Sequence, residues 1–244
     1  MFDSVFENPA ILAIVFTFIY TSYRDLVSRE IPELSWVPAY LVVLIDFVVR
    51  RLNEFSLINT AVAMTPSLIY GLLFALGMIG GADFLAILLV SLGHLSEPLI
   101  PLLVFILSSM APLPIAFINL LRNLTIDRKA IESINCVKGG KKILYLVGRL
   151  ITVAEFLRKK FAFLHTYPEE EGFICIGSTN VNIDFEEQKK SLERALSRGL
   201  VKSDDYVVYS PALPHIVFIA ASYLITLLAA FYVRELSIFL GKQL

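Results

Sequence analysis

The feature that most constrains this chain is a series of apolar runs, the longer of which approach twenty residues. An α-helix of about 20 apolar residues matches the hydrocarbon core of a bilayer, which is roughly 30 Å thick. The chain is 57% hydrophobic and has a mean hydropathy of +0.72, whereas soluble domains are usually about 45–50% apolar. These runs predict a membrane-spanning helical bundle rather than a soluble domain.

Six apolar runs are expected to cross the membrane. The fourth run is short, and its eleven residues reach only about 17 Å at 1.5 Å per residue. It either crosses a locally thinned bilayer or re-enters on the side from which it came, in which case the crossings number five. The runs cover about residues 9–22, 34–49, 60–79, 82–92, 98–121 and 214–233.

The distribution of charge divides the chain into three parts. Residues 122–209 contain 15 of the 21 lysines and arginines and 12 of the 22 acidic residues. The predicted fold is an all-α polytopic membrane bundle of about six helices, with a small α+β cytoplasmic domain inserted before the last helix. Transmembrane helices 1–5 are expected in residues 1–121, the soluble domain in 122–209, and the last transmembrane helix in 210–244.

Within the charged domain, short runs rich in aromatic and β-branched residues predict strands at about 161–167, 172–176 and 206–209. Apolar residues at helical spacing predict a surface helix over 141–160. A second helix is expected from 184 to about 198, with Gly199 as its C-terminal cap. The domain is therefore expected to mix helices and strands.

The sequence gives no indication of a metal, a cofactor or a nucleic-acid partner. The three histidines and two cysteines are too scattered for a metal site, and no glycine pattern fits a nucleotide. The net charge of −1 does not suggest a polyanionic partner. Cys136 and Cys175 are expected to be free thiols in a reducing compartment.

Two aspartates stand at the edges of apolar runs. Asp25 follows the first run, and Asp83 begins the fourth in the segment Gly80-Gly81-Ala82-Asp83. A carboxylate at the centre of a membrane helix costs about 2.5–3.5 kcal/mol on insertion scales, so an acid in or near hydrocarbon is a functional candidate. The chain crosses the membrane twice between the two, which places both aspartates on the same face.

Basic residues near the ends of the runs indicate that this face is cytoplasmic. Arg24 and Arg29 follow the first run, and Arg122 begins the charged domain after the fifth. Lysines and arginines are enriched on the cytoplasmic side of membrane proteins. Arg50 and Arg51 oppose this orientation unless their side chains extend along the helix to the interface.

Each aspartate also has an interpretation that involves no catalysis. Asp25 could be an interfacial loop charge paired with Arg24 or Arg29. Asp83 could cap a helix after a Gly-Gly turn. The position of both residues on one face favours a joint role without excluding these alternatives.

Two neighbouring carboxylates can hydrolyse a peptide bond without a metal or cofactor. Carboxylates about 3 Å apart cannot both ionise, so they share a proton, and one acts as base while the other acts as acid. Asp25 and Asp83 are therefore the candidate catalytic pair. The turn formed by Gly80, Gly81 and Ala82 is expected to support the site by letting a substrate backbone approach closely.

Around these residues the sequence resembles the GxGD membrane aspartyl proteases, in particular the type IV prepilin peptidase group and, within it, the archaeal preflagellin (archaellin) peptidases. The resemblance rests on Asp25 in an Asp-x5-Ile-Pro setting, on Asp83 at the start of the fourth helix, and on a cytoplasmic domain before the last helix. Ala82 replaces the second glycine of the Gly-x-Gly-Asp motif. The resemblance implies that Asp25 and Asp83 are catalytic.

The resemblance also implies a substrate and a location. The expected activity is an aspartic endopeptidase of the cell membrane that removes the short basic leader (signal) peptide from preflagellin-like or prepilin-like precursors at the cytoplasmic face. Its expected partners are these precursors, each with a charged leader and a hydrophobic helix, and the lipid bilayer. The acidic residues 169–171 could attract the basic leader, or could form a solvated loop.

Alternative functions remain open beside this one. The segment Pro211-Ala212-Leu213-Pro214 resembles the Pro-Ala-Leu element of presenilin and signal peptide peptidase, which cleave within transmembrane helices. A transporter that binds protons or cations would instead require Asp46, inside the second run, as much as Asp25 and Asp83. A non-catalytic scaffold would require none of them. Asp46 is expected to pair with Arg50, one helical turn later.

Overall fold

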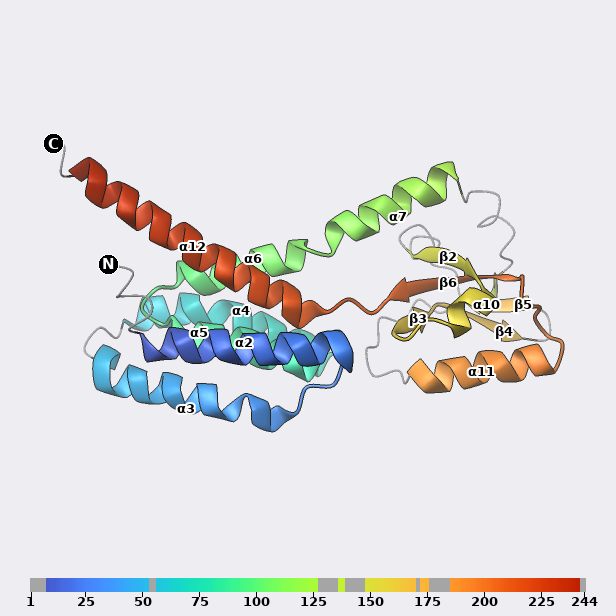
Figure 1. The fold of residues 1–244 in the computed structure, drawn as a ribbon, viewed down its shortest axis with the longest axis horizontal. Helices are drawn as coiled ribbons and strands as arrows, with labels where there is room; N and C mark the ends of the chain where they lie inside the picture. Colours follow the sequence, from blue (N-terminus) through green and yellow to red (C-terminus); the bar gives the residue numbers. More distant parts are fainter. Residues whose placement is uncertain are drawn as a thin grey trace. The chain divides into compact units, whose positions relative to one another are not determined.

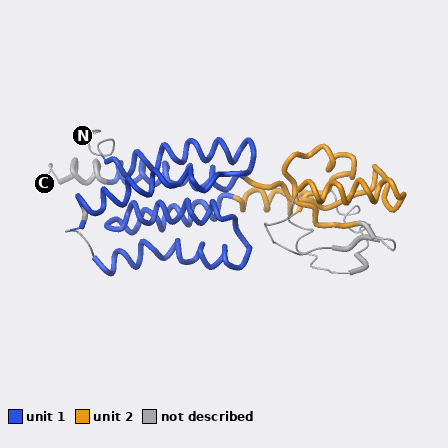
Figure 2. Tube along the Cα trace, turned by 90° about the horizontal axis from the view of Figure 1, so that it is seen from below, with its two compact units in different colours: residues 1–111, 214–244 blue, residues 112–213 orange. Residues whose placement is uncertain are grey.

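The computed structural model describes residues 8–52, 56–126, 136–138, 148–169, 172–175 and 185–241. The chain divides into two compact units, which Figure 2 shows in different colours. Unit 1 comprises residues 1–111 and 214–244, and unit 2 comprises residues 112–213. The charged segment lies within unit 2.

Unit 1 is built from helices that run alongside one another (Figures 1 and 2). Each predicted apolar run forms at least one helix, and a 3₁₀ turn at Glu33–Ser35 and a π-helical turn at Phe47–Arg51 flank the second. The helices of unit 1 are α2 (Pro9–Val27), α3 (Val37–Asp46), α4 (Leu57–Ala75), α5 (Gly81–Gly93), α6 (Leu99–Met110) and α12 (His215–Gly241).

Helix α5 is the central helix of unit 1. It packs against α2, α3, α4, α6 and α12, and its Ile87, Leu89 and Val90 are fully buried in the core. A helix of 13 residues extends only about 20 Å, which is shorter than the hydrocarbon core of a bilayer. Because other helices surround α5, it does not need to match that thickness by itself. This burial explains why a short apolar run can still be a stable helix of the bundle.

The outer faces of the unit 1 helices remain apolar. Phe16, Leu44, Leu68 and Ile225 are each more than half exposed, and apolar patches of this kind mark surfaces that contact lipid or protein. Among the described residues, four helical segments are long and apolar enough to cross a membrane, and α5 is apolar but shorter. The four segments are 9–27, 57–75, 99–125 and 215–233. The count of six crossings stays a prediction.

The fifth apolar run contains a break that the sequence analysis did not anticipate. Helix α6 ends at Met110, and α7 (Leu113–Thr125) begins after a turn at Ala111 and Pro112. A proline inside a helix removes a backbone N–H and its ring clashes with the carbonyl four residues earlier. Pro112 and Pro114 therefore account for the interruption, and α7 belongs to unit 2.

The described residues of unit 2 form two three-stranded sheets and three helices. In one sheet the central strand β6 (Tyr206–Pro211) pairs antiparallel with β2 (Arg149–Thr152) and β3 (Ala162–Leu164). In the other, β5 (Gly172–Cys175) pairs parallel with β1 (Cys136–Lys138) and antiparallel with β4 (Thr166–Glu169). The helices are α7, α10 (Val153–Leu157) and α11 (Phe185–Ser197).

The predicted strands and the second helix of the charged domain are present. Helix α11 ends at Ser197, and Gly199 has a φ of 73°, as expected for its cap. The helix predicted over 141–160 is wrong for residues 149–152, which form β2 because its buried Leu150 and Ile151 pair with β6. Residues 139–147, and Glu170 and Glu171 of the acidic run, lie outside the described residues.

Candidate active site

Asp25 lies in the last turn of α2, and its carboxylate has two partners. Its Oδ2 accepts a hydrogen bond of 3.1 Å from the backbone N–H of Ile216, and its Oδ1 lies 3.3 Å from Nη1 of Arg29. Ile216 is the second residue of α12, and N–H groups in the first turn of a helix have no acceptor within the helix. Asp25 supplies that acceptor from a neighbouring helix.

Asp83 is the third residue of α5, and it also has two partners. Its Oδ2 accepts a hydrogen bond of 3.3 Å from the backbone N–H of Gly80, which closes the first turn of the helix. Its Oδ1 lies 3.3 Å from Nδ1 of His215, the first residue of α12. Gly80 rather than Asp83 is therefore the N-cap of α5, and Asp83 bonds back to it from the third position of the helix while also contacting a second helix.

The start of α12 brings the two aspartates together. His215 contacts Asp83, and the next residue, Ile216, contacts Asp25. Consecutive Cα atoms are about 3.8 Å apart, so both carboxylates lie in one small region, and they interact electrostatically. The expectation that both lie at the same end of the bundle agrees with this arrangement.

Groups that can carry positive charge lie beside both carboxylates. Arg29 and His215 each lie within ion-pair distance of one of them. The N-terminal ends of α5 and α12 add further positive potential, because each helix end carries a partial charge of about +0.5. These groups offset the repulsion between two acids in a largely apolar bundle.

Arg29 has an unusual backbone. Its φ of 60° makes it the only non-glycine residue with a positive φ in the described part of the chain. The left-handed conformation costs an ordinary residue about 1–2 kcal/mol. The sequence left open whether Arg24 or Arg29 pairs with Asp25, and the structure has the ion pair at Arg29.

Gly81 and Ala82 lie where the sequence predicted, at the beginning of α5. A Cβ on Gly81 would lie 3.4 Å from Cε2 of Phe74, and a Cβ on Gly80 would lie 3.5 Å from Oδ2 of Asp83. Ala82 packs against the core of unit 1. Gly80 caps the N-terminus of α5, and Gly81 and Ala82 are its first two residues, directly before Asp83.

Sequence reasoning misses His215 and Ile216. The three histidines are too far apart in the sequence to suggest a shared site. A sequence also does not reveal which backbone N–H group will bind a distant side chain. One observation could have found His215: it stands directly after Pro214, at the beginning of the last apolar run. Under six crossings, that run begins on the face that also carries both aspartates.

Asp46 is buried in α3, and its Oδ1 lies 3.4 Å from Nε of Arg50. The predicted pairing of these two residues is confirmed. Among the described residues, no group of three or more histidines, cysteines and acids could hold a metal ion.

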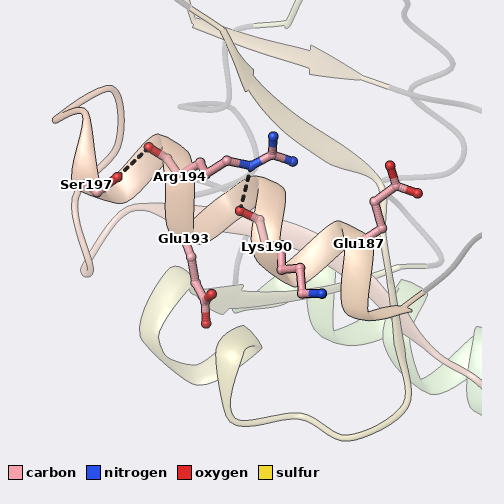
Figure 3. A pocket seen from close by; sticks show the side chains of 5 residues that line it. All are labelled: Glu187, Lys190, Glu193, Arg194 and Ser197. Carbon is pink, nitrogen blue, oxygen red and sulfur yellow. Dashed lines mark hydrogen bonds between the residues drawn. The ribbon is translucent and has the colours of Figure 1, made fainter.

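A hollow of 710 Å³ lies on α11 in unit 2 (Figure 3). It is lined by Glu187, Lys190, Glu193, Arg194 and Ser197. Two of these side chains bond to their own helix, because Arg194 Nε donates to the Lys190 carbonyl and the Ser197 hydroxyl donates to the Arg194 carbonyl. We interpret this charged hollow as the solvated face of α11, and neither aspartate lines it.

Comparison with known families decides the class of the protein. Residues 140–230 match the family model described as Archaeal Peptidase A24 C-terminus Type II. This part of the chain is therefore similar to the C-terminal region of archaeal A24 peptidases. The match extends from unit 2 into α12 and includes His215 and Ile216. A search of curated proteins found no match. This similarity supports a peptidase of the A24 type, and the long apolar helices support a membrane protein.

Proposed function

We propose that this protein is an aspartic endopeptidase of the A24 type that removes short basic leader peptides from preflagellin-like or prepilin-like precursors. The observation that carries the proposal is the contact of Asp25 and Asp83 with adjacent residues of α12. The similarity of residues 140–230 to an archaeal A24 peptidase family supports peptide hydrolysis in general. Two carboxylates held together supply the acid and the base that this reaction requires.

In the proposed mechanism the two carboxylates share one proton. The ionised carboxylate takes a proton from water as the water oxygen attacks the carbonyl carbon of the scissile peptide. The protonated carboxylic acid donates a hydrogen bond to the carbonyl oxygen, and the leaving amine then takes a proton from the pair.

Two features support cleavage at the cytoplasmic face. Asp25 lies at the end of α2 beside Arg24 and Arg29, and such basic residues favour the cytoplasmic side. A precursor whose hydrophobic helix lies in the bilayer would present its charged leader at that same level. Gly80 and Gly81 carry no side chains of their own, so an extended peptide could approach the backbone near Asp83 closely.

Cleavage by membranes that contain single variants tests the proposal. Membranes carrying wild type, Asp25→Asn, Asp83→Asn or Asp46→Asn are mixed with a leader-bearing precursor, and the mature product is followed by gel mobility. Loss of a general acid or base lowers the rate about 10²–10⁴-fold, so we expect that loss for the first two variants. Asp46→Asn should retain cleavage because Asp46 pairs with Arg50.

The other outcomes separate the alternative functions. Wild-type cleavage by Asp25→Asn or Asp83→Asn would reject the aspartate pair. A loss in Asp46→Asn as large as in the other two, together with dependence on a proton or ion gradient, would indicate a transporter. A product cut within its hydrophobic helix would indicate an intramembrane protease of the presenilin type. Equal amounts of each variant in the membrane are the control for folding.

A further inference from the structure

His215 stands at the proposed catalytic pair without belonging to it. Its Nδ1 lies 3.3 Å from Oδ1 of Asp83, and its imidazole also interacts electrostatically with Asp25. The side chain is only 22% exposed. The histidine therefore faces both acids from a helix that contributes no acid of its own to the site.

Contacts from two further helices hold the imidazole in place. Its ring stacks on that of Tyr70 in α4, with centroids 6.1 Å apart and an interplanar angle of 13°. The backbone of Ser108 in α6 is a hydrogen-bond partner of the ring. Tyr70 is itself buried and packs edge to face on Phe105, with centroids 5.7 Å apart. The orientation of His215 is thus set by α4, α5 and α6 together.

The stability of α12 does not explain a histidine at its first position. A positive charge at the N-terminus of a helix opposes the helix dipole and is unfavourable. The neighbouring carboxylates of Asp83 and Asp25 compensate this charge. A histidine at this position therefore suits interaction with the two carboxylates better than it suits the start of a helix.

We propose that His215 is a positioning residue for the aspartate pair, an inference that rests on the proposed function. The imidazole fixes the carboxylate of Asp83, while the N–H of Ile216 fixes that of Asp25. Because these two partners are consecutive residues, the first turn of α12 sets the placement of one acid relative to the other. A misplacement of about 1 Å can cost an enzyme on the order of 10² in rate.

Substitution of His215 in the full-length protein tests this inference. We expect His215→Ala to lower kcat about 100-fold with little change in KM, because the acids lose their alignment but substrate binding does not change. His215→Asn should recover most of that loss. The asparagine amide stands near the position of Nδ1 and can donate a hydrogen bond to Asp83.

The pH profile of kcat/KM distinguishes positioning from a structural role. The titratable groups that face His215 are Asp83 from α5, Asp25 from α2 and Tyr70 from α4. Replacing the imidazole by an amide removes one titrating group from this set. We therefore expect a limb of the profile to move in His215→Asn at unchanged thermal stability.

The other two histidines of the chain provide matched controls. His94 is fully buried and bonds to Glu97 and Tyr223 at 3.1 and 3.0 Å, and His165 lies in unit 2. His94→Asn should lower thermal stability, and neither His94→Asn nor His165→Asn should move the pH profile.

Failure of this inference is distinguishable from failure of the proposed function. If His215→Ala cleaves at the wild-type rate while Asp25→Asn and Asp83→Asn do not, the positioning role is rejected and the aspartate pair stands. If the aspartate variants retain cleavage, the proposed function itself fails. Should His215→Ala not fold, His215→Asn decides, and a wild-type pH profile in that variant would overturn the inference.

Discussion

Arg29 combines a left-handed backbone with an ion pair to Asp25. Such a conformation persists in a non-glycine residue only where the surroundings impose it, and it is often found at functional sites. Here the strained residue is the one that places a guanidinium beside a proposed catalytic acid. At the scale of a single residue, strain and charge compensation therefore occur together.

Two substitutions separate these effects at Arg29. Glycine removes the strain and the charge, whereas alanine removes the charge and keeps the strain. We expect Arg29→Gly to be more stable than Arg29→Ala by about 1 kcal/mol, as measured by thermal unfolding in detergent. Both should cleave more slowly than wild type because Asp25 loses its ion-pair partner. Equal stability of the two variants would argue against a strained backbone at this position.

The sequence reveals those site residues that stand out within their own segment, either by a charge beside apolar residues or by a helical spacing. Asp25 and Asp83 stand out because charge is rare beside hydrocarbon, and Asp46 and Arg50 are four residues apart. The partners on α12 are different, since Ile216 lies 191 positions from Asp25. Only the packing of α12 against α2 and α5 brings them together.

At the scale of the helices, α5 lies tightly against α2 at Gly93. A Cβ added to Gly93 would lie 2.6 Å from Cδ1 of Ile14, which is fully buried. Real carbon atoms do not approach so closely, so any side chain at this position must displace Ile14. The absence of a side chain at the end of α5 is what permits this contact between the two helices.

Compensating substitutions test this contact. Gly93→Ala should destabilise the protein by about 1–3 kcal/mol as an overpacked core does, even though alanine favours a helix by about 1 kcal/mol. Ile14→Val removes the Cδ1 atom, so Gly93→Ala combined with Ile14→Val should recover stability relative to Gly93→Ala alone. Thermal unfolding of the three variants measures this. A stabilising Gly93→Ala would show that Ile14 moves aside freely.

Elements were predictable from sequence where a single physical factor decides them. Long apolar runs produce helices because burial and backbone hydrogen bonding favour the same structure. Prolines 112 and 114 interrupt one such run, which hydropathy alone does not detect. Residues 149–152 follow helical periodicity yet form β2, because pairing with β6 overrides a weak local preference.

At the scale of the whole molecule, the proposed site depends on the return of the chain to unit 1. Helices α2 and α5 precede unit 2, and α12 follows it. The two acids come from the first part of the chain, whereas the residues that hold them together come from the last helix. Unit 1 therefore has a complete site only when α12 has joined the bundle.

The cleavage rate of a double variant tests the central claim most directly, namely that Asp25 and Asp83 form one site. Rates are compared for Asp25→Asn, Asp83→Asn and the variant with both substitutions, on the same leader-bearing precursor. Residues that act as a unit show strongly non-additive effects, because neither carboxylate alone supplies both acid and base. We predict that each single variant loses as much activity as the double variant. Losses that multiply in the double variant, or cleavage by it at the wild-type rate, would contradict the account.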